Sequence, residues 1–505
     1  MVEATATQAS PPTAIPAARL MRFLDEQLAV DARSLALGRI AIATLLLYDL
    51  GLRASDLGAH YTDQGVWPRA ILHMRNWSFV WSWHALGGSI GFEAGLFAAA
   101  AMAGLALLVG YRTWLATLAS FLLALSVQAR NPFLHDGQDD LLRLLLFWSL
   151  WLPLGRRWSV DALAGSQRHS EHSELGSIRV SGLCALGLAG QLALLYESSA
   201  VGKLQSGWWT SGHGIVHALQ LGRYETAGGV WLAAHVPGVL NLLSFPVIGL
   251  EAALPLLLWI PWRRDGVRLA AIALAVVLHG SFWIFLRLSI FPPLSIAGWL
   301  LFLPSSVWPS SVSEGIAPQP HAALPLTGRS IAATAILLVE LLYVIGTHVG
   351  QPVLPGLARR AVEAAGLQQY WVVFSPPRPG LVTDGFFVAP GLLQDGSQVD
   401  LFKPDGLLTW ERPALISTSF ADSRWRHFYA NLVVDWARGS NQWSDTLVVR
   451  EATAHWMCRD WAARHPSGPS LQRASLYFVE HAVERSPEHL GEEPRRRLLA
   501  QVACF

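Results

Sequence analysis

The chain of 505 residues has little charge, little cysteine and almost no lysine. Only 14% of its residues are charged, whereas soluble proteins carry roughly 25%. With 52% apolar residues, too little polar surface remains to keep a chain of this size in solution. The net charge of +1 provides no basic surface for nucleic acid, so we expect no nucleic-acid partner. These shortages favour a polytopic membrane protein.

Lysine is the rarest of the common charged residues here. The chain has 37 basic residues, and all except Lys203 and Lys403 are arginines. An ammonium group can release its proton, whereas a guanidinium group cannot. Lys203 is therefore a candidate base, although two surviving lysines are also compatible with chance.

Apolar blocks close to the length of a membrane-spanning helix, about 20 residues, recur along the chain. Residues 1–34 are polar and contain prolines, which predicts a tail and a short amphipathic helix. We predict a helical membrane domain over 35–348 and a small α+β extramembrane domain over 349–505. The fold class is thus mainly α, a polytopic bundle of about nine spans: Leu35–Leu52, Ile90–Tyr111, Thr113–Gln128, Asp139–Leu154, Ser177–Ala200, Val239–Trp262, Val267–Phe285, Ser289–Pro304 and Arg329–Thr347.

The arginines of the short loops predict the orientation. Most of them fall on the side of the N-terminus, which places that terminus in the cytoplasm. Nine spans then place the C-terminal domain outside. Cys458 and Cys504 lie in this domain, and an oxidising compartment would allow them to pair. Their spacing leaves both a disulfide and two free buried thiols open.

The C-terminal domain contains both strand and helix patterns. Asp384-Gly385 and Asp395-Gly396 predict hairpin turns on either side of an apolar run. The sequence beyond them predicts two helices, a strand and a closing basic helix, the first three over Arg424–Arg438, Leu447–Arg464 and Ala474–Ala482.

Ionisable residues in or beside apolar spans are the main functional candidates. Lys203 follows the fifth span and precedes Trp208. It is either a lysine that reaches to the membrane surface or a desolvated lysine that can act as a base. His279, late in the seventh span, is a hydrogen-bonded core residue or a catalytic partner. Arg287 closes that span and either binds an acidic group or faces lipid headgroups.

A dense polar loop precedes the fourth span and contains His135, Asp139 and Arg143. Asp139 is placed either to pair with Arg143 at i, i+4 or to cap the helix N-terminus. Neither role explains His135. In the first outer loop, Asp63 belongs to a turn or to the same outer site. Under the predicted orientation these acids and histidines share one side with Lys203.

A metal site is not predicted. The loop over 169–174 contains two histidines and two glutamates, but it lacks ligand partners at convincing spacing. We interpret it as a solvated loop.

Several stretches in order resemble the horizontally transferred transmembrane (HTTM) family, the membrane domain of the vitamin K-dependent gamma-glutamyl carboxylases and bacterial relatives. The resemblance covers about Leu35–Pro304 and depends on order and spacing together. The stretches are Tyr61–Gly65, Gly110–Thr113, Arg130–Pro132 with Asp139-Asp140, Trp151–Gly155 with Ser159–Asp161, and Gly202–Leu204 with Trp208. Beyond this region, Tyr370–Pro376 is similar to the segment that opens the outer domain in many bacterial members.

The resemblance implies a chemistry. In the carboxylase a lysine deprotonates reduced vitamin K, oxygen adds, and the strong base that results removes the gamma proton of a glutamate before carbon dioxide is fixed. Lys203 matches the lysine and His279 a histidine at the end of a late span. Asp139 stands where the carboxylase has a histidine, and Gly202 replaces the first member of its lysine pair. The resemblance therefore supports the fold more than the reaction.

Two functions of different classes are compatible with these features. The first is a membrane enzyme, carboxylase- or lyase-like, in which Lys203 acts on a quinol-like substrate such as a reduced quinone of the vitamin K type. His279 and Asp139 would orient that substrate, Asp63, His135 and Arg287 would bind it, and the outer domain would present a polypeptide or a small acid. The second is a non-enzymatic scaffold or lipid-binding protein that displays its C-terminal domain. Transport is weaker, because no inverted repeat of broken helices is evident.

Overall fold

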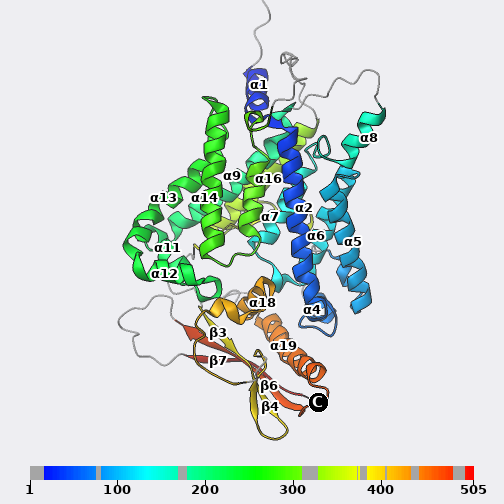
Figure 1. Cartoon of the computed structure of the whole chain (residues 1–505), viewed down its shortest axis with the longest axis vertical. Coiled ribbons are helices and arrows are strands. Elements are labelled where there is room, and N and C mark those ends of the chain that lie inside the picture. The colour runs from blue at the N-terminus through cyan, green and yellow to red at the C-terminus, as the bar shows by residue number, and fades with distance from the viewer. Residues whose placement is uncertain are drawn as a thin grey trace, which may run out of the picture.

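The computed structural model describes residues 16–74, 81–168, 179–309, 328–371, 373–375, 384–403, 407–433, 443–481 and 495–504. The loop over 169–174, considered above for metal binding, lies outside these residues. Within them the chain is mainly helical and has a small antiparallel sheet near the C-terminus (Figure 1).

Helices that could cross a bilayer dominate the first two thirds of the chain. The described residues contain 6 that are long and apolar enough: α2 (Ala32–Ser55), α5 (Ile90–Val109), α9 (Gly182–Gln205), α13 (Pro237–Leu257), α14 (Arg264–Phe285) and α16 (Gly328–Val349). Many of their apolar side chains are exposed on the outside of the bundle, where a soluble protein would carry charge. The chain is therefore a multi-pass integral membrane protein whose surroundings include a lipid bilayer.

The predicted count of nine spans is not confirmed. Three of the predicted segments form α6 (Thr113–Arg130), α7 (Gly137–Ser149) and α15 (Phe291–Leu300), which are not among the candidate spans. With a rise of ~1.5 Å per residue, α7 and α15 are only about 20 and 15 Å long, less than the ~30 Å hydrocarbon core of a bilayer. Almost every residue of α7 is buried by protein. An apolar sequence therefore did not distinguish a helix enclosed by protein from one enclosed by lipid.

Short helices cover the two ends of the bundle. Figure 1 shows α1 (Pro16–Leu28) and α8 (Val160–Arg168) at one end, and α4 (Arg69–Met74) and α12 (Ala227–His235) at the other, beside the sheet. We call the latter the sheet end. The remaining short helices are α3 (Leu57–Tyr61), α10 (Gly207–Thr210), α11 (Gly214–Gln220) and α17 (Gly356–Ala364). A two-stranded sheet of β1 (Val30–Asp31) and β2 (Arg179–Val180) completes the membrane domain.

The stretches Gly110–Thr113 and Ser159–Asp161 hold one reversal of the chain together. Gly110 ends α5 with φ 70°, a left-handed conformation that glycine adopts without strain. The carboxylate of Asp161 then accepts hydrogen bonds from the backbone N–H groups of Arg112 and Thr113, both at 2.8 Å. These residues therefore fix the turn between α5 and α6.

At the sheet end two other stretches meet. Arg130 donates to the carbonyl oxygens of Trp67 and Tyr61 at 2.8 and 2.7 Å, and Asn131 donates to that of His60 at 3.2 Å. The stretches Tyr61–Gly65 and Arg130–Pro132 thus hold the first loop against the 3-10 turn η2 (Pro132–Leu134).

The C-terminal sheet is built around one long strand, β6 (Leu471–His481). The strands β3 (Asp384–Val388) and β4 (Pro390–Leu393) pair along one edge of β6, and β7 (Arg496–Ala503) pairs along the other. β5 (Gln398–Asp400) extends the sheet beyond β4. Two helices lie between β5 and β6 in the sequence. The first, α18 (Ser423–Val433), packs against η2, and the second, α19 (Trp443–Arg464), packs against β6 and β7.

Details of this domain confirm some predictions and correct others. The turn at Asp395-Gly396 joins β4 to β5, with Gly396 at φ 83°. Asp384-Gly385 instead lies inside β3, and the predicted closing helix is wrong because β7 takes its place. Pairing with the exposed edge of β6 decided that outcome over local propensity. Cys458 and Cys504 form a disulfide with a Cα–Cα distance of 5.5 Å, which links α19 to the end of β7.

Candidate functional site

Lys203 lies in the last turn of α9 and is buried, with a relative exposure of 1%. Its Nζ donates to Ser199 Oγ at 2.7 Å, and to the two carboxylate oxygens of Glu251 at 3.1 and 2.8 Å. It also lies 4.9 Å from the centre of the Trp209 ring. The lysine is thus held in a fixed, largely apolar site, and does not extend to the surface of the bundle.

Glu251 is the partner that the sequence analysis missed. It comes from α13, 48 positions after Lys203, and is itself buried. The sequence contained a signal for this partner. A glutamate inside the apolar stretch of α13 has a high free-energy cost in a membrane unless it is paired. Glu197, the acid that precedes Lys203 by six positions in the sequence, has no contact with Lys203 among those of the described residues.

His279 occupies a second polar position in the bundle, close enough for its ring to interact electrostatically with Lys203. Its Nε2 shares a hydrogen bond of 2.6 Å with Tyr196 Oη, which accepts one of 2.8 Å from Trp299. Because the tyrosine oxygen accepts from Trp299, its own O–H is free to donate to Nε2. In the neutral ring this leaves the proton on Nδ1, which has no hydrogen-bond partner among the described residues.

A cavity of about 530 Å³ lies between the bundle and the C-terminal domain. Its described lining includes Phe291, which is in ring contact with His279, and Trp208, the neighbour of the tryptophan that Lys203 touches. Lys203 and His279 themselves are not among these lining residues. The lysine site therefore lies behind the cavity wall. The wall is formed by α7, α10, α15, α18, the 3-10 turn η3 (Gly222–Tyr224) and residues 370, 371 and 373–375.

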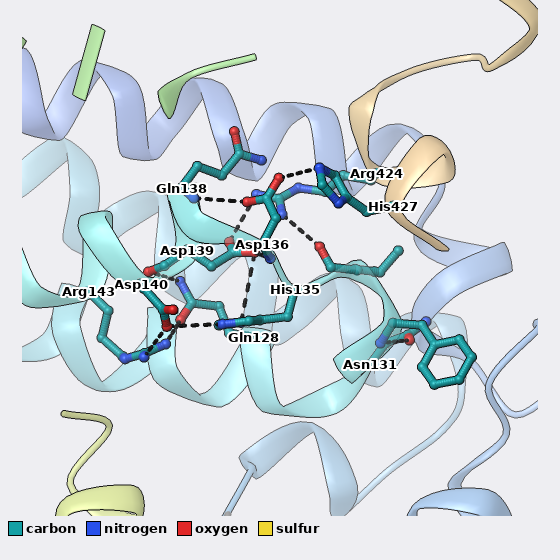
Figure 2. Close-up of polar contacts among 12 residues, drawn as sticks. Gln128, Asn131, His135, Asp136, Gln138, Asp139, Asp140, Arg143, Arg424 and His427 are labelled. Atoms are coloured by element: carbon teal, nitrogen blue, oxygen red, sulfur yellow. Dashed lines mark hydrogen bonds and ion pairs between the residues drawn. The ribbon is translucent and has the colours of Figure 1, made fainter. Parts of the chain in front are cut away.

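Asp139 takes part in a different site. It is buried at the start of α7, where it accepts from Arg424 Nη1 at 2.7 Å and from Arg424 Nη2 at 3.0 Å, and pairs with Arg53. Asp49 pairs with both arginines, through a 2.8 Å bond from Arg53 Nε and a bond from Arg424 Nη2. We call these four residues the interface network. Its two positive and two negative charges join α2, α7 and α18, and Figure 2 shows Arg424 reaching toward Asp139.

Asp139 also has the capping role considered above. Its carboxylate accepts from the backbone N–H of Asp136 at 3.1 Å, and Asp136 in turn caps α7 by accepting from the N–H of Gln138 at 2.9 Å. The alternative pair with Arg143 is wrong, because Arg143 binds Asp140 at 2.6 Å. Arg143 also donates to the carbonyl oxygen of Gly366 at 2.5 Å, so it fixes the segment after α17.

Two histidines face carboxylates at the cavity (Figure 2). Burial alone would lower the pKa of His135, but Asp140, whose Oδ1 lies 3.0 Å from His135 Nε2, raises that pKa above its ordinary value. His427 lies 2.6 Å from Asp136. Burial lowers the pKa of His427 despite this carboxylate. Burial would raise the pKa of Asp136, but His427 holds it well below its usual range.

The two remaining predicted residues lie apart from Lys203. Asp63 is half-exposed and binds Arg69 at 2.6 Å, and the hydrogen bond from that side chain lowers the pKa of Asp63. Arg287 is exposed just after α14, and its backbone N–H donates to the carbonyl oxygen of Tyr224 at 2.9 Å. The structure therefore groups Lys203 with His279, and His135 with the cavity. It places Asp139 in the interface network.

Searches against family models, curated proteins and solved structures found no match to this chain. Among the described residues, no group of three histidine, cysteine or acidic side chains could hold a metal ion. The functional argument therefore depends on the geometry of the lysine site and the cavity.

Proposed function

We propose that the chain is an integral-membrane enzyme of the HTTM type in which Lys203 serves as a general base toward a membrane-soluble, quinol-like substrate. The observation that carries the proposal is the buried contact of Lys203 with Glu251 and Ser199. A lysine is costly to bury, and a chain whose other basic residues are arginines, except for Lys403, has here a residue that can release its proton.

The residues around Lys203 suit proton transfer. Glu251 lies within hydrogen-bond distance of Nζ and is the nearest described acceptor that can take its proton. With that proton on Glu251, the amine of Lys203 is free to accept another from a substrate hydroxyl. His279 offers the unpartnered Nδ1 of a ring whose other nitrogen is held by Tyr196, so it can donate to a substrate oxygen. Trp209 and the apolar bundle exclude water, which strengthens these interactions.

A reduced quinone of the vitamin K type fits this residue set. It supplies an acidic hydroxyl and the reducing electrons, and its ring and tail are soluble in the membrane. The acid or polypeptide that would be modified reaches the site from the sheet end, which we place outside the cell. The disulfide between Cys458 and Cys504 supports that orientation, because disulfides persist in oxidising compartments.

The test uses detergent-purified protein, reduced phylloquinone and menaquinone, oxygen and labelled bicarbonate, with quinone epoxide as the product measured. We expect epoxide from the wild type and a loss of roughly 10²–10⁴-fold in rate for Lys203→Ala. Lys203→Arg should fail as badly, because its guanidinium keeps its proton. The other lysine provides the control: Lys403 is partly exposed and lies 3.6 Å from Asp400, so Lys403→Arg should retain full activity.

The alternative is a non-enzymatic scaffold that displays its C-terminal domain. The interface network favours it, because these four charges hold α18 firmly against the bundle. Full activity in Lys203→Arg would exclude the proposed base. An absence of epoxide from folded wild-type protein with several quinols would support the scaffold. The partner of that scaffold should then bind the membrane-anchored C-terminal domain equally well when Lys203 is replaced.

A further inference from the structure

The cavity between the bundle and the C-terminal domain has polar groups whose hydrogen bonds are unmade. Arg426, on α18, is only 4% exposed, yet its Nε and Nη2 have no hydrogen-bond partner among the described residues. The same holds for Nε2 of Gln138, whose Oε1 accepts from the backbone N–H of Ile290, and for Nε of Arg223. All three side chains line the cavity. Buried polar groups without partners are costly, so this arrangement points to a missing acceptor.

Each of these unpartnered atoms is a donor, and the described lining contains two arginines and one aspartate beside two histidines. Asp136 is the one carboxylate in the described lining, and it is already bound by His427 and by the N–H of Gln138. Asp136 attracts Arg426, whereas Arg223 and Arg287 add positive charge around it. The guanidinium groups of Arg426 and Arg223 lie over the ring of Tyr224, at 5.0 and 5.2 Å from its centre. The aromatic ring positions them without satisfying their N–H groups.

Much of the remaining cavity wall is apolar. Side chains from four separate parts of the chain form it: Trp208, Leu221, Leu288, Phe291, Trp371 and Phe374. A cavity volume of about 530 Å³ lies in the range of sites that enclose small organic molecules. The occupant must therefore combine a negatively charged hydrogen-bond acceptor with an apolar body.

We propose that this cavity binds an amphiphilic oxyanion, a carboxylate or phosphate group attached to an apolar chain or ring. Arg426 binds the oxyanion through its two free N–H groups, in the fork geometry by which guanidinium recognises such groups. Gln138 and Arg223 donate to the same group, and the apolar body packs against Trp208, Phe291 and Trp371. A soluble organic acid and an anionic lipid both have this chemistry. The site follows from the cavity alone and does not require the chemistry of Lys203.

The test measures binding without turnover. Protein in phosphatidylcholine nanodiscs is titrated with octanoate, with octanol as the uncharged ligand of the same length, and with inorganic phosphate as the head group alone. We expect octanoate to bind and octanol to bind at least about tenfold more weakly. Arg426→Met should weaken octanoate binding by a similar factor, because each change removes a charge-assisted interaction. Arg464→Met, on the exposed Arg464–Asp460 pair of α19, removes the same charge and should bind as the wild type does.

Nanodiscs that contain phosphatidylglycerol identify the source of the ligand. If this lipid blocks octanoate in the wild type, the occupant is a lipid head group, and if it does not, the occupant is a soluble acid. Equal octanoate affinity in wild type and Arg426→Met would overturn the proposal, as would failure of folded wild-type protein to bind either anion. Arg426→Lys, which keeps the charge and loses the fork, should bind with intermediate affinity and replaces the methionine variant if that does not fold. Because no quinol is present, these results are independent of the epoxide assay.

Discussion

Two arginines two positions apart on α18 lie in opposite environments. Arg424 is 1% exposed, and its Nη1 and Nη2 donate to Asp139, Asp49 and the carbonyl oxygen of Leu134. Only its Nε lacks a hydrogen-bond partner among the described residues. Arg426 is 4% exposed, and two of its nitrogens have no partner in the described part of the chain. Burial is the same for both, so burial does not separate a structural charge from a binding one. The difference lies in how many of the guanidinium hydrogen bonds the protein itself supplies.

The largest expected effect comes from replacing Arg424, which the carboxylates of Asp49 and Asp139 bind. Arg424→Met leaves Asp49 and Asp139 with only Arg53 between them, and removing one partner of a buried charge pair costs about 3–5 kcal/mol. Thermal unfolding in detergent and protease sensitivity of the C-terminal domain measure this loss. Arg69→Met, which breaks the half-exposed pair with Asp63, is the control and should cost under about 1 kcal/mol.

A double variant decides whether charge balance is the cause. Arg424→Met with Asp139→Leu removes one positive and one negative charge, and Asp49 keeps its partner Arg53. It should therefore be more stable than Arg424→Met alone. A double variant that is less stable than the single one would show that packing at α18, rather than charge balance, governs the interface.

The same substitution at Arg426 should have a much smaller effect. Arg426→Met removes a buried charge whose hydrogen bonds are unmade, so we expect the free energy of unfolding without ligand to stay within about 1 kcal/mol or to rise. Thermal unfolding of ligand-free protein, run beside Arg424→Met, makes the comparison direct. A loss as large as that of Arg424→Met would mean that Arg426 also serves the interface.

The smallest expected effect concerns His135, which lines the cavity and contacts Asp140. Because Asp140 raises the pKa of His135 in the folded protein, the charged pair stabilises that state below about pH 6.5, and this contribution is lost as the pH rises through the raised pKa. His135→Gln should therefore lower thermal stability in mildly acidic buffer, by ~1 kcal/mol or less, and leave it unchanged in alkaline buffer. An equal loss at both pH values would contradict this assignment.

Local signals predicted the helices better than the sites. The apolar stretches of α2, α5, α9, α13, α14 and α16 are long enough to be recognised individually, and the turn at Asp395-Gly396 follows from its residues. The sequence predicts spans at α7 and α15 because burial in protein and burial in lipid require the same side chains. β7 was missed because strand pairing with β6 is a long-range contact that no local pattern records.

The amino-acid sequence by itself determined the membrane class and the approximate positions of the long helices, and it singled out Lys203 as a candidate base. Each of these depends on composition or on neighbours along the chain. Only the tertiary structure decided that Glu251 is the partner of Lys203, that Asp139 belongs to the interface network, and that Arg426 faces a cavity. The energy of a buried charge depends on the groups within a few ångströms of it, and folding brings those groups together from helices that are distant in the sequence.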